Sequence, residues 1–248
     1  MEITHLSESV TVKRINEDGA KGIFEIEGLY RGYGVTVGSS LRRILLSSIP
    51  GAAITRFKVK GVSHEFDTIP GVMEDVLQIA LNLKKIRFKF HAHEPQVLTL
   101  KAKGEGEVTA GDVSGNAEVE VQNKDLHIAT LTTKGAELDM ELTVEKGLGY
   151  RPIGSGEDEK LPVGVIAIDA VFSPVTNVSF EVETTRVGER ADYNKVILAI
   201  ETDGTLSPSQ VLHKASEILL DHFQKIADLD VLEAKGAEIT AKKKTKSK

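Results

Sequence analysis

The sequence contains no cysteine and no tryptophan, and aromatic residues make up only 5% of its 248 residues. Without cysteine the chain has no disulfide framework, no thiolate nucleophile and no cysteine-based metal site. No apolar run reaches the roughly 20 residues that a membrane-spanning helix needs, and MEITHLSESV lacks the basic-then-apolar order of a signal peptide. The core must rest on Val, Ile, Leu and Ala, and the 40% hydrophobic content suits a globular protein. These features predict a cytoplasmic protein.

Basic residues are outnumbered by acidic ones, 31 to 37, and five of the lysines lie in Lys242–Lys248. Removing those five leaves 26 basic residues against 37 acidic ones, a net charge of −11. Such a body is a poor match for wrapping nucleic acid, because phosphate neutralisation needs clustered Lys and Arg. We expect residues 233–248 to form a basic, disordered tail, the alternative being a nucleic-acid-binding module that works through these lysines.

Short segments near the N-terminus alternate apolar and polar residues, as half-buried strands do, and they span residues 9–13, 22–27 and 55–60. A Gly-rich turn over 31–38 leads into a predicted helix from about Gly38 to Ile49, ended by Pro50-Gly51. We expect Pro70 to open a second helix, whose apolar stripe at helical spacing is Val72, Val76, Ile79 and Leu83.

From about Ile86 to Val171 the pattern is nearly all strand, interrupted by Gly-containing turns. Strands follow at 178–184 and 195–201, joined by a charged connection. The sequence Ser207-Pro208-Ser209-Gln210 is typical of a capped helix start. The long helix that it opens carries a broad, mostly apolar stripe made of Val211, Ala215, Ile218, Leu219, His222, Phe223 and Ile226.

The elements fall into three blocks: strand-strand-helix, a mainly β middle, and again strand-strand-helix. Pairing the outer blocks predicts an α+β fold with a discontinuous domain, residues 1–50 plus 172–232, built from strands and two main helices. Residues 51–171 then form an inserted, mostly β domain, since insertions are tolerated where the two ends of a loop lie close together.

The segment Arg31–Gly38 follows a strand and precedes a helix, a position in which glycines can surround a phosphate. Its Gly-x-Gly-x-x-x-Gly spacing is one residue too long for the dinucleotide fingerprint, and no Gly-Lys-Ser/Thr follows. We interpret it as a flexible turn. The alternative is a stand-alone nucleotide-binding protein that uses the Gly32–Gly38 turn.

The helix after this turn has two different sides. One side, expected to pack on other elements, consists of Leu41, Ile44, Leu45, Ser48 and Ile49. Arg42, Arg43 and Leu46 fall mostly off that side. Two adjacent arginines beside an apolar residue resemble an interface anchor, since Arg is enriched at interface hot spots; the other interpretation is a solvated helix surface.

Residues with catalytic or metal-binding chemistry are scattered. Among the histidines, His91 and His93 share a predicted strand face, and two imidazoles without a third ligand do not define a metal site. Glu157-Asp158-Glu159 lies in a Gly-flanked loop and is interpreted as solvated. No Ser/His/Asp order or carboxylate pair has catalytic spacing, so we expect no catalytic residue, cofactor or metal in this chain.

The segment Leu29–Gly51, LYRGYGVTVGSSLRRILLSSIPG, closely resembles the N-terminal part of the bacterial RNA polymerase α subunit. Further stretches resemble that family in the same order, and they are Val62–Phe66, Gly71–Val76, Leu81–Lys84, Gly147–Tyr150, Asp169–Val175 and Glu201–Pro208. The resemblance covers about residues 5–230. It implies a non-catalytic subunit of a nucleotidyltransferase complex, whose metal-binding carboxylates belong to the β′ subunit.

The resemblance also implies partners and surfaces. Two copies would associate through the outer-block helices, and the dimer would be the platform on which the β and β′ subunits assemble. The implied dimer interface is Leu41, Ile44, Leu45, Ser48, Ile49, Val211, Ala215, Ile218, Leu219, His222 and Phe223. The implied large-subunit interface is Arg42, Arg43, Leu46 and, within the region 182–190, Arg186.

After about Asp230 the sequence departs from the family pattern. Most α subunits continue through a linker into a small C-terminal domain that contacts upstream promoter DNA. Here the sequence runs into the lysine-rich segment Lys242–Lys248. We therefore expect little or no direct DNA contact by this chain and no contact with a membrane.

Overall fold

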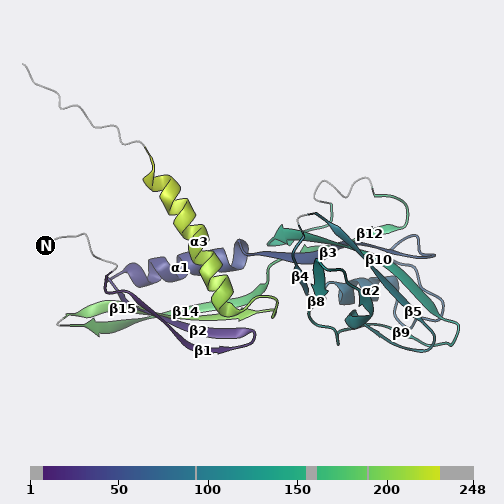
Figure 1. Cartoon of the computed structure of the whole chain (residues 1–248), viewed down its shortest axis with the longest axis horizontal. Helices are drawn as coiled ribbons and strands as arrows, with labels where there is room; N and C mark the ends of the chain where they lie inside the picture. Colours follow the sequence, from purple (N-terminus) through teal and green to yellow (C-terminus); the bar gives the residue numbers. More distant parts are fainter. Residues whose placement is uncertain (1–7, 93, 155–160, 189, 230–248) are drawn as a thin grey trace, which may run out of the picture.

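The computed structural model describes residues 8–92, 94–154, 161–188 and 190–229. Figure 1 shows an elongated chain with two lobes side by side. The outer lobe contains β1 (Thr11–Asp18), β2 (Lys21–Leu29), α1 (Tyr33–Ser47), β14 (Val175–Val187), β15 (Arg190–Thr202) and α3 (Pro208–Ala227). The inserted lobe contains the elements between α1 and β14. This mixture of antiparallel sheets and helices confirms the predicted α+β class.

The outer lobe is a four-stranded antiparallel sheet in the order β1-β2-β15-β14, with α1 and α3 packed against it. Strand β15 lies between β14 and the hairpin of β1 and β2. The pairing of β15 with β2 joins segments about 170 residues apart in the sequence. Its core combines apolar residues of both chain segments, among them Phe24, Leu45, Leu198 and Val211. Because the strands alternate, one face of the sheet supplies these residues and the other meets solvent.

The inserted lobe is built on a five-stranded antiparallel sheet in the order β12-β3-β10-β5-β7. Its strands and helices are β3 (Pro50–Val59), α2 (Val76–Leu83), β4 (Phe88–Phe90), β5 (Gln96–Lys103), β6 (Gly106–Thr109), the 3₁₀ turn η2 (Ala110–Asp112), β7 (Val113–Ser114), β8 (Val119–Val121), β9 (His127–Leu131), β10 (Glu137–Leu148), β11 (Tyr150–Arg151), β12 (Val165–Ala167) and β13 (Ala170–Val171).

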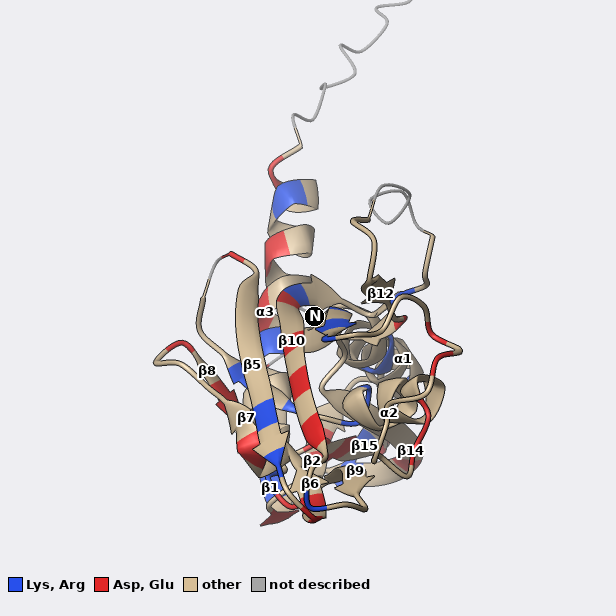
Figure 2. Ribbon diagram, turned by 90° about the vertical axis from the view of Figure 1, so that its right-hand side faces the viewer, with Lys and Arg blue, Asp and Glu red and all other residues tan. Residues whose placement is uncertain are grey.

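The two faces of the inserted sheet differ in polarity. On the inner face, Leu142 of β10 lies opposite Phe57 of β3 and Leu98 of β5, and all three side chains are buried. On the outer face, cross-strand ion pairs join Lys101 to Asp139 (3.7 Å) and Lys103 to Glu137 (3.1 Å). Figure 2 shows blue bands on β5 beside red bands on β10. The period of two residues produces both faces.

The hydrophobic residues of the two lobes form separate cores. One cluster lies within residues 52–168, and the other combines residues 24–49 with residues 175–215. The separation supports the predicted division into a discontinuous domain and an insertion, which stays a prediction. None of the described helices combines the length and the apolar content needed to cross a membrane.

Two predicted helix starts are wrong. The first helix begins at Tyr33, so most of the expected Gly-rich turn is helical. The second begins at Val76, capped by Asp75, whose Oδ1 accepts the Gln78 N–H at 2.6 Å. Pro70 does not open it, because Gly71 at φ 78° and the bridge between Val72 and Leu131 keep this segment out of the helical conformation.

The third helix starts as predicted: Ser207 and Gln210 form a reciprocal capping box, and Pro208 is the first helical residue. Strand β4 ends at Phe90, so His91 lies beyond it, which corrects the predicted shared strand face. His93, the acidic residues 157–159 and the tail 233–248 lie outside the described residues.

Candidate interaction surfaces of α1 and α3

Helix α1 lies unusually close to the sheet because of two glycines one turn apart. A Cβ on Gly34 would lie 2.7 Å from Val182 Cγ1, and one on Gly38 would lie 2.5 Å from Phe180 Cδ2. Residues four apart share one side of a helix, so Gly34 and Gly38 together make the side that faces β14. The glycines of the expected flexible turn therefore serve close helix–sheet packing.

The N-terminus of α1 is capped from a distant strand. Gly32 precedes the helix with φ 88° and has no side chain to cap it. The Oδ1 atom of Asn194, on β15, instead accepts the Gly32 N–H at 2.8 Å and the Gly34 N–H at 3.4 Å. These are amide groups that a phosphate would bind. Because Asn194 already binds them, the Gly32–Gly38 segment offers no phosphate loop for the nucleotide-binding alternative.

An aromatic cluster surrounds this capped end. Tyr30 packs edge-on against Tyr33 and Tyr193, with ring centroids 6.2 and 6.1 Å apart. The Arg190 guanidinium lies 5.2 Å from the Tyr30 centroid, and its bidentate hydrogen bonds with Asp192 raise its pKa. The sequence patterns did not predict this cluster. The features that could have indicated it are an arginine and three tyrosines near the end of β2 and the start of β15. It holds the turn end of the β14–β15 hairpin against the N-terminus of α1.

The predicted dimer residues of α1 divide into two groups. Leu41, Leu45 and Ile49 are buried in the core of this chain, at 6%, 0% and 1% exposure. Ile44 and Ser48 are half-buried. The first group packs on the chain's own sheet, and the second group retains surface for a partner.

The arginine side of α1 is open. Arg42, Arg43 and Leu46 are exposed and line a shallow hollow together with Phe180 of β14. Within the described part of the chain, neither guanidinium has a carboxylate partner. The hollow thus combines two unpaired planar donors with apolar surface, a composition that favours protein contacts.

Arg186 lies elsewhere. It is near the end of the β14–β15 hairpin, where its Nε donates to the Gly188 carbonyl at 2.9 Å. It does not line the hollow of Arg42 and Arg43. The structure therefore brings together three of the four residues predicted to contact a large subunit and leaves the fourth apart.

Helix α3 also divides into two parts. Its first half packs on the sheet through Val211 and Ala215, both 0% exposed. Its second half leaves the lobe, as Figure 1 shows, and residues 221–229 are all exposed. Ile218 and Leu219 are half-buried, His222 is exposed with its Nδ1 2.7 Å from the Ile218 carbonyl, and Phe223 is 60% exposed.

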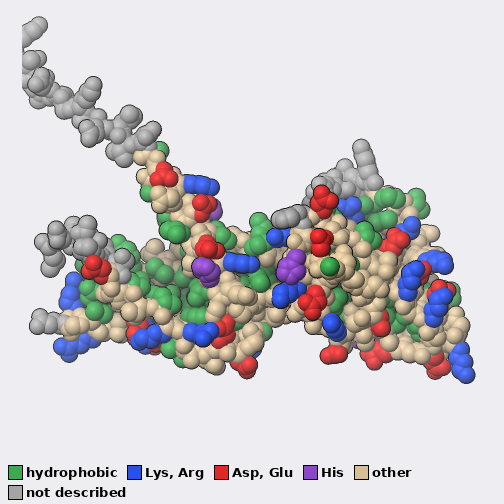
Figure 3. Space-filling view, viewed as in Figure 1, with side chains coloured by type: hydrophobic (Ala, Val, Ile, Leu, Met, Phe, Trp, Pro, Cys, Tyr) green, Lys and Arg blue, Asp and Glu red, His purple; other side chains and the backbone are tan. Residues whose placement is uncertain are grey.

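The exposed apolar surface of α3 extends past the residues predicted for the dimer interface. Leu220, Ile226 and Leu229 are exposed by 68%, 67% and 73%. Figure 3 shows hydrophobic side chains gathered along this helix and over the adjoining outer lobe. The spacing of residues 219, 223 and 226 carried the signal for Ile226. Leu220 widens the same side of the helix, and Leu229 follows just past its end.

In the described part of the chain, no group of three or more His, Asp or Glu side chains is arranged to hold a metal ion. The described surface of the outer lobe carries an apolar helix stripe and an arginine-lined hollow, a composition typical of contact with other macromolecules.

Comparison with known proteins places these features in a class. Residues 55–173 match the family model described as "RNA polymerase Rpb3/RpoA insert domain". The inserted lobe is therefore similar to the insert domain of RNA polymerase subunits.

Relatives named "DNA-directed RNA polymerase subunit alpha" align along most of the chain. The protein from Alkaliphilus oremlandii is 48% identical over 223 residues, which are 90% of this chain and 70% of the relative. That from Symbiobacterium thermophilum is 50% identical over 213 residues, 86% and 67% of the two chains. That from Oceanobacillus iheyensis is 46% identical over 234 residues, 94% and 74%. The chain belongs to the family of DNA-directed RNA polymerase alpha subunits and is part of a nucleotidyltransferase complex.

Proposed function

We propose that this chain homodimerises through α1 and α3 and that the dimer is the platform on which the β and β′ subunits assemble. The observation that carries the proposal is the stripe of α3, which exposes Leu220, Phe223 and Ile226 on a helix that projects from the lobe, with exposed Leu229 just past its end. Contiguous apolar surface of this kind marks an interaction site. The proposal keeps the predicted division into two domains, with the outer lobe as the dimerisation domain.

The burial of single residues refines the dimer interface. Leu41, Leu45, Ile49, Val211 and Ala215 are buried in their own chain and support the contact from beneath. Ile44, Ser48, Ile218, Leu219, His222 and Phe223 retain surface and form the contact itself. An isologous contact of two such helix pairs would bury roughly 2,000 Å² or more, the scale of obligate dimers.

The arginine side of α1 is the proposed surface for a large subunit. Arg42 and Arg43 present donors to carboxylates of the partner, and Leu46 adds apolar area within the same hollow. Ile44 and Ser48 of the proposed dimer contact also line this hollow, so the two contacts adjoin each other on one helix. Arg186 provides a separate, more distant contact.

The dimer is tested by sedimentation equilibrium of the full chain. Phe223→Asp places a charge in the proposed interface and should weaken the dimer about 30-fold or more, the effect of a hot-spot change of about 2 kcal/mol. Gln224→Asp is the matched control: it adds the same charge beside the stripe and should leave the dimer intact. A wild-type chain that stays monomeric at a concentration on the order of 0.1 mM contradicts the proposal.

The large-subunit surface is tested by capture of purified β subunit. The double variant Arg42→Ala, Arg43→Ala should dimerise normally and lose about tenfold or more in β affinity. The double variant Lys58→Ala, Lys60→Ala removes the same charge from the exposed surface of the inserted lobe. If both double variants capture β equally well, the arginines are not the contact.

A further inference from the structure

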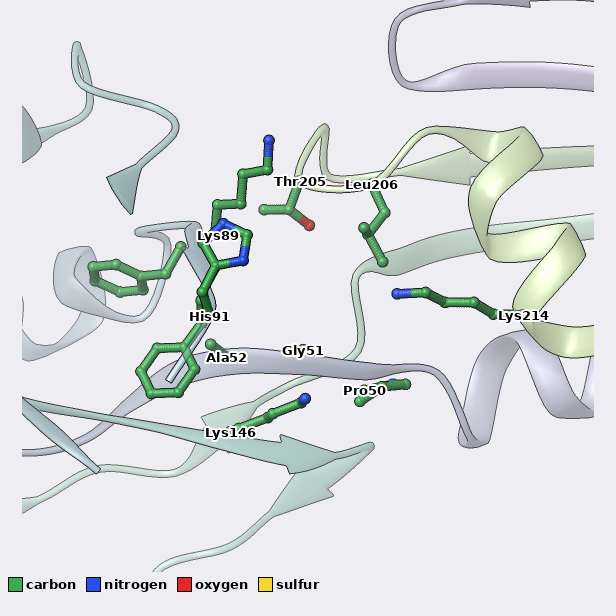
Figure 4. A pocket seen from close by; sticks show the side chains of 11 residues that line it. Pro50, Gly51, Ala52, Lys89, His91, Lys146, Thr205, Leu206 and Lys214 are labelled. Carbon is green, nitrogen blue, oxygen red and sulfur yellow. The ribbon is translucent and has the colours of Figure 1, made fainter. Parts of the chain in front are cut away.

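A pocket at the junction of the two lobes is lined by positive charge. Lys89, His91 and Lys146 come from the inserted lobe, and Lys214 comes from α3 of the outer lobe. Figure 4 shows Lys146 and Lys214 approaching the segment Pro50–Ala52 from different sides, with His91 and Lys89 on the side of the pocket near Thr205. Segments far apart in the sequence thus bring three lysines to one place.

These basic side chains have no partners in the described part of the chain. No carboxylate pairs with Lys89, Lys146 or Lys214, although Glu120 lies opposite Lys89 in the β4–β8 ladder. Asp203 lies two residues before Thr205, which lines the pocket, but its carboxylate already has other partners. Arg87 Nε lies 3.5 Å from Asp203 Oδ2, and Thr205 Oγ1 donates to Asp203 Oδ1 at 2.6 Å. The charges of Lys146 and Lys214 are therefore unpaired in the described part of the chain, whereas Lys89 has Glu120 as its cross-strand neighbour.

We propose that this pocket binds an oligophosphate anion, held by both lobes at once. Lysine ammonium groups are compact charges with three donors each and bind phosphate oxygens from several directions. The positive charge of three such groups is more than one carboxylate would neutralise. The negative charge of two or more linked phosphates matches it. Phe88 and Phe90 add apolar lining, which strengthens the attraction by lowering the local dielectric.

The position of the pocket gives the anion a structural effect. When the pocket is empty, Lys214 of the outer lobe and Lys89 and Lys146 of the inserted lobe repel one another across the junction. A bound oligophosphate replaces this repulsion by attraction to both sides. Binding therefore ties the lobes together and stabilises the folded chain by an amount that rises with the logarithm of ligand concentration above Kd.

Two sources present this chemistry: inorganic pyrophosphate and the triphosphate group of a nucleotide. Calorimetric titration of the full chain with pyrophosphate, tripolyphosphate and ATP, without divalent metal, separates them. Equal affinity for tripolyphosphate and ATP assigns recognition to the phosphates, and tighter ATP binding adds the nucleoside. Both results support the site, and no binding of any of the three overturns it.

Variants locate the binding. Lys146→Gln and Lys214→Gln should each reduce affinity about tenfold and remove most of the ligand-induced rise in Tm. Lys134→Gln, at an exposed lysine of another loop, is the matched control and should bind as the wild type does. Equal losses in all three variants, or an equal rise in Tm with sodium chloride of the same ionic strength, would reject the site in favour of general screening.

A charge reversal gives an independent readout. Lys214→Glu should abolish oligophosphate binding and raise the Tm of the ligand-free chain, because attraction replaces repulsion across the junction. A Lys214→Glu variant that still binds pyrophosphate would show that the anion does not bridge the lobes. Duplex DNA serves as a second anionic ligand. If the lysine variants lose affinity for duplex DNA but keep their affinity for pyrophosphate, the proposal is likewise rejected.

Discussion

Gly38 lies where α1 comes closest to the sheet. Three ring atoms of Phe180 would lie within 2.5–3.0 Å of a Cβ at this position. A helical glycine normally costs about 1 kcal/mol relative to alanine, because it is more flexible in the unfolded chain. Here the cost is offset by the close approach that it permits.

Gly38→Ala should therefore destabilise the protein, against the usual helix preference. The clash with the Phe180 ring is expected to outweigh the gain of about 1 kcal/mol and to lower the free energy of unfolding by about 1–2 kcal/mol net. Urea denaturation measures the change. Gly135→Ala, where no atom lies within 4 Å of the new Cβ, is the control and should be nearly neutral.

Asn194 caps α1 from another strand, so its effect is larger than that of an ordinary surface asparagine. Asn194→Ala removes the acceptor of the Gly32 and Gly34 amides and should cost about 0.5–2 kcal/mol. Asn194→Asp keeps the acceptor and places a negative charge at the helix N-terminus, which is favourable. Thermal unfolding should rank the alanine variant below the aspartate variant; the reverse order would contradict the capping role.

At the scale of elements, His127 connects three parts of the inserted lobe. From β9, its Nε2 lies 2.9 Å from Glu74, just before α2, and its Nδ1 lies 2.9 Å from Glu107 on β6. Glu74 also accepts the Thr130 N–H at 2.7 Å. The hydrogen bond with Glu74 raises the pKa of His127 above its usual 6.5.

The bridge predicts a pH dependence of stability. Because the pKa of His127 is raised on folding, its contribution is complete below pH 6.5 and is lost as the pH rises through the folded value. Burial opposes ionisation of Glu74, but hydrogen bonds from Thr130 and His127 lower its pKa below 4.5, so its contribution is complete above that pH. The stability difference between wild type and His127→Gln should be largest between pH 4.5 and 6.5.

Urea titrations of the two proteins from pH 4 to 9 measure this difference. His213→Gln removes an imidazole from the exposed surface of α3 and serves as the control. A difference between wild type and His127→Gln that is constant over the whole range would show that the charged bridge does not contribute.

At the scale of the whole molecule, dimerisation couples stability to concentration. If the folded chain is a dimer and the unfolded chain is not, mass action raises Tm with protein concentration. Calorimetry over a hundredfold range of concentration should show this rise for the wild type and a much smaller one for Phe223→Asp. A concentration-independent Tm for the wild type would contradict an obligate dimer.

The local patterns of the sequence predicted much of the fold. Alternating residues in β2 and β10 and the capping box at Ser207 are short-range features, and the structure confirms them. The start of α1 was mispredicted because glycine disfavours helices, and only contact with Phe180 and Val182 makes Gly34 and Gly38 suitable there. The distant cap by Asn194 left no local signal.

The sequence by itself determined the family, the α+β class and the amphipathic character of α1 and α3, since these depend on residue order and spacing. It did not determine which half of each apolar stripe is covered by the chain's own sheet. That depends on how far the sheet extends beneath each helix, which leaves Phe223 exposed and buries Val211. Tertiary structure alone also gathered Lys89, Lys146 and Lys214 around one pocket, because the return of the chain after the insertion places Lys214 of α3 at a pocket also lined by residues of β4 and β10.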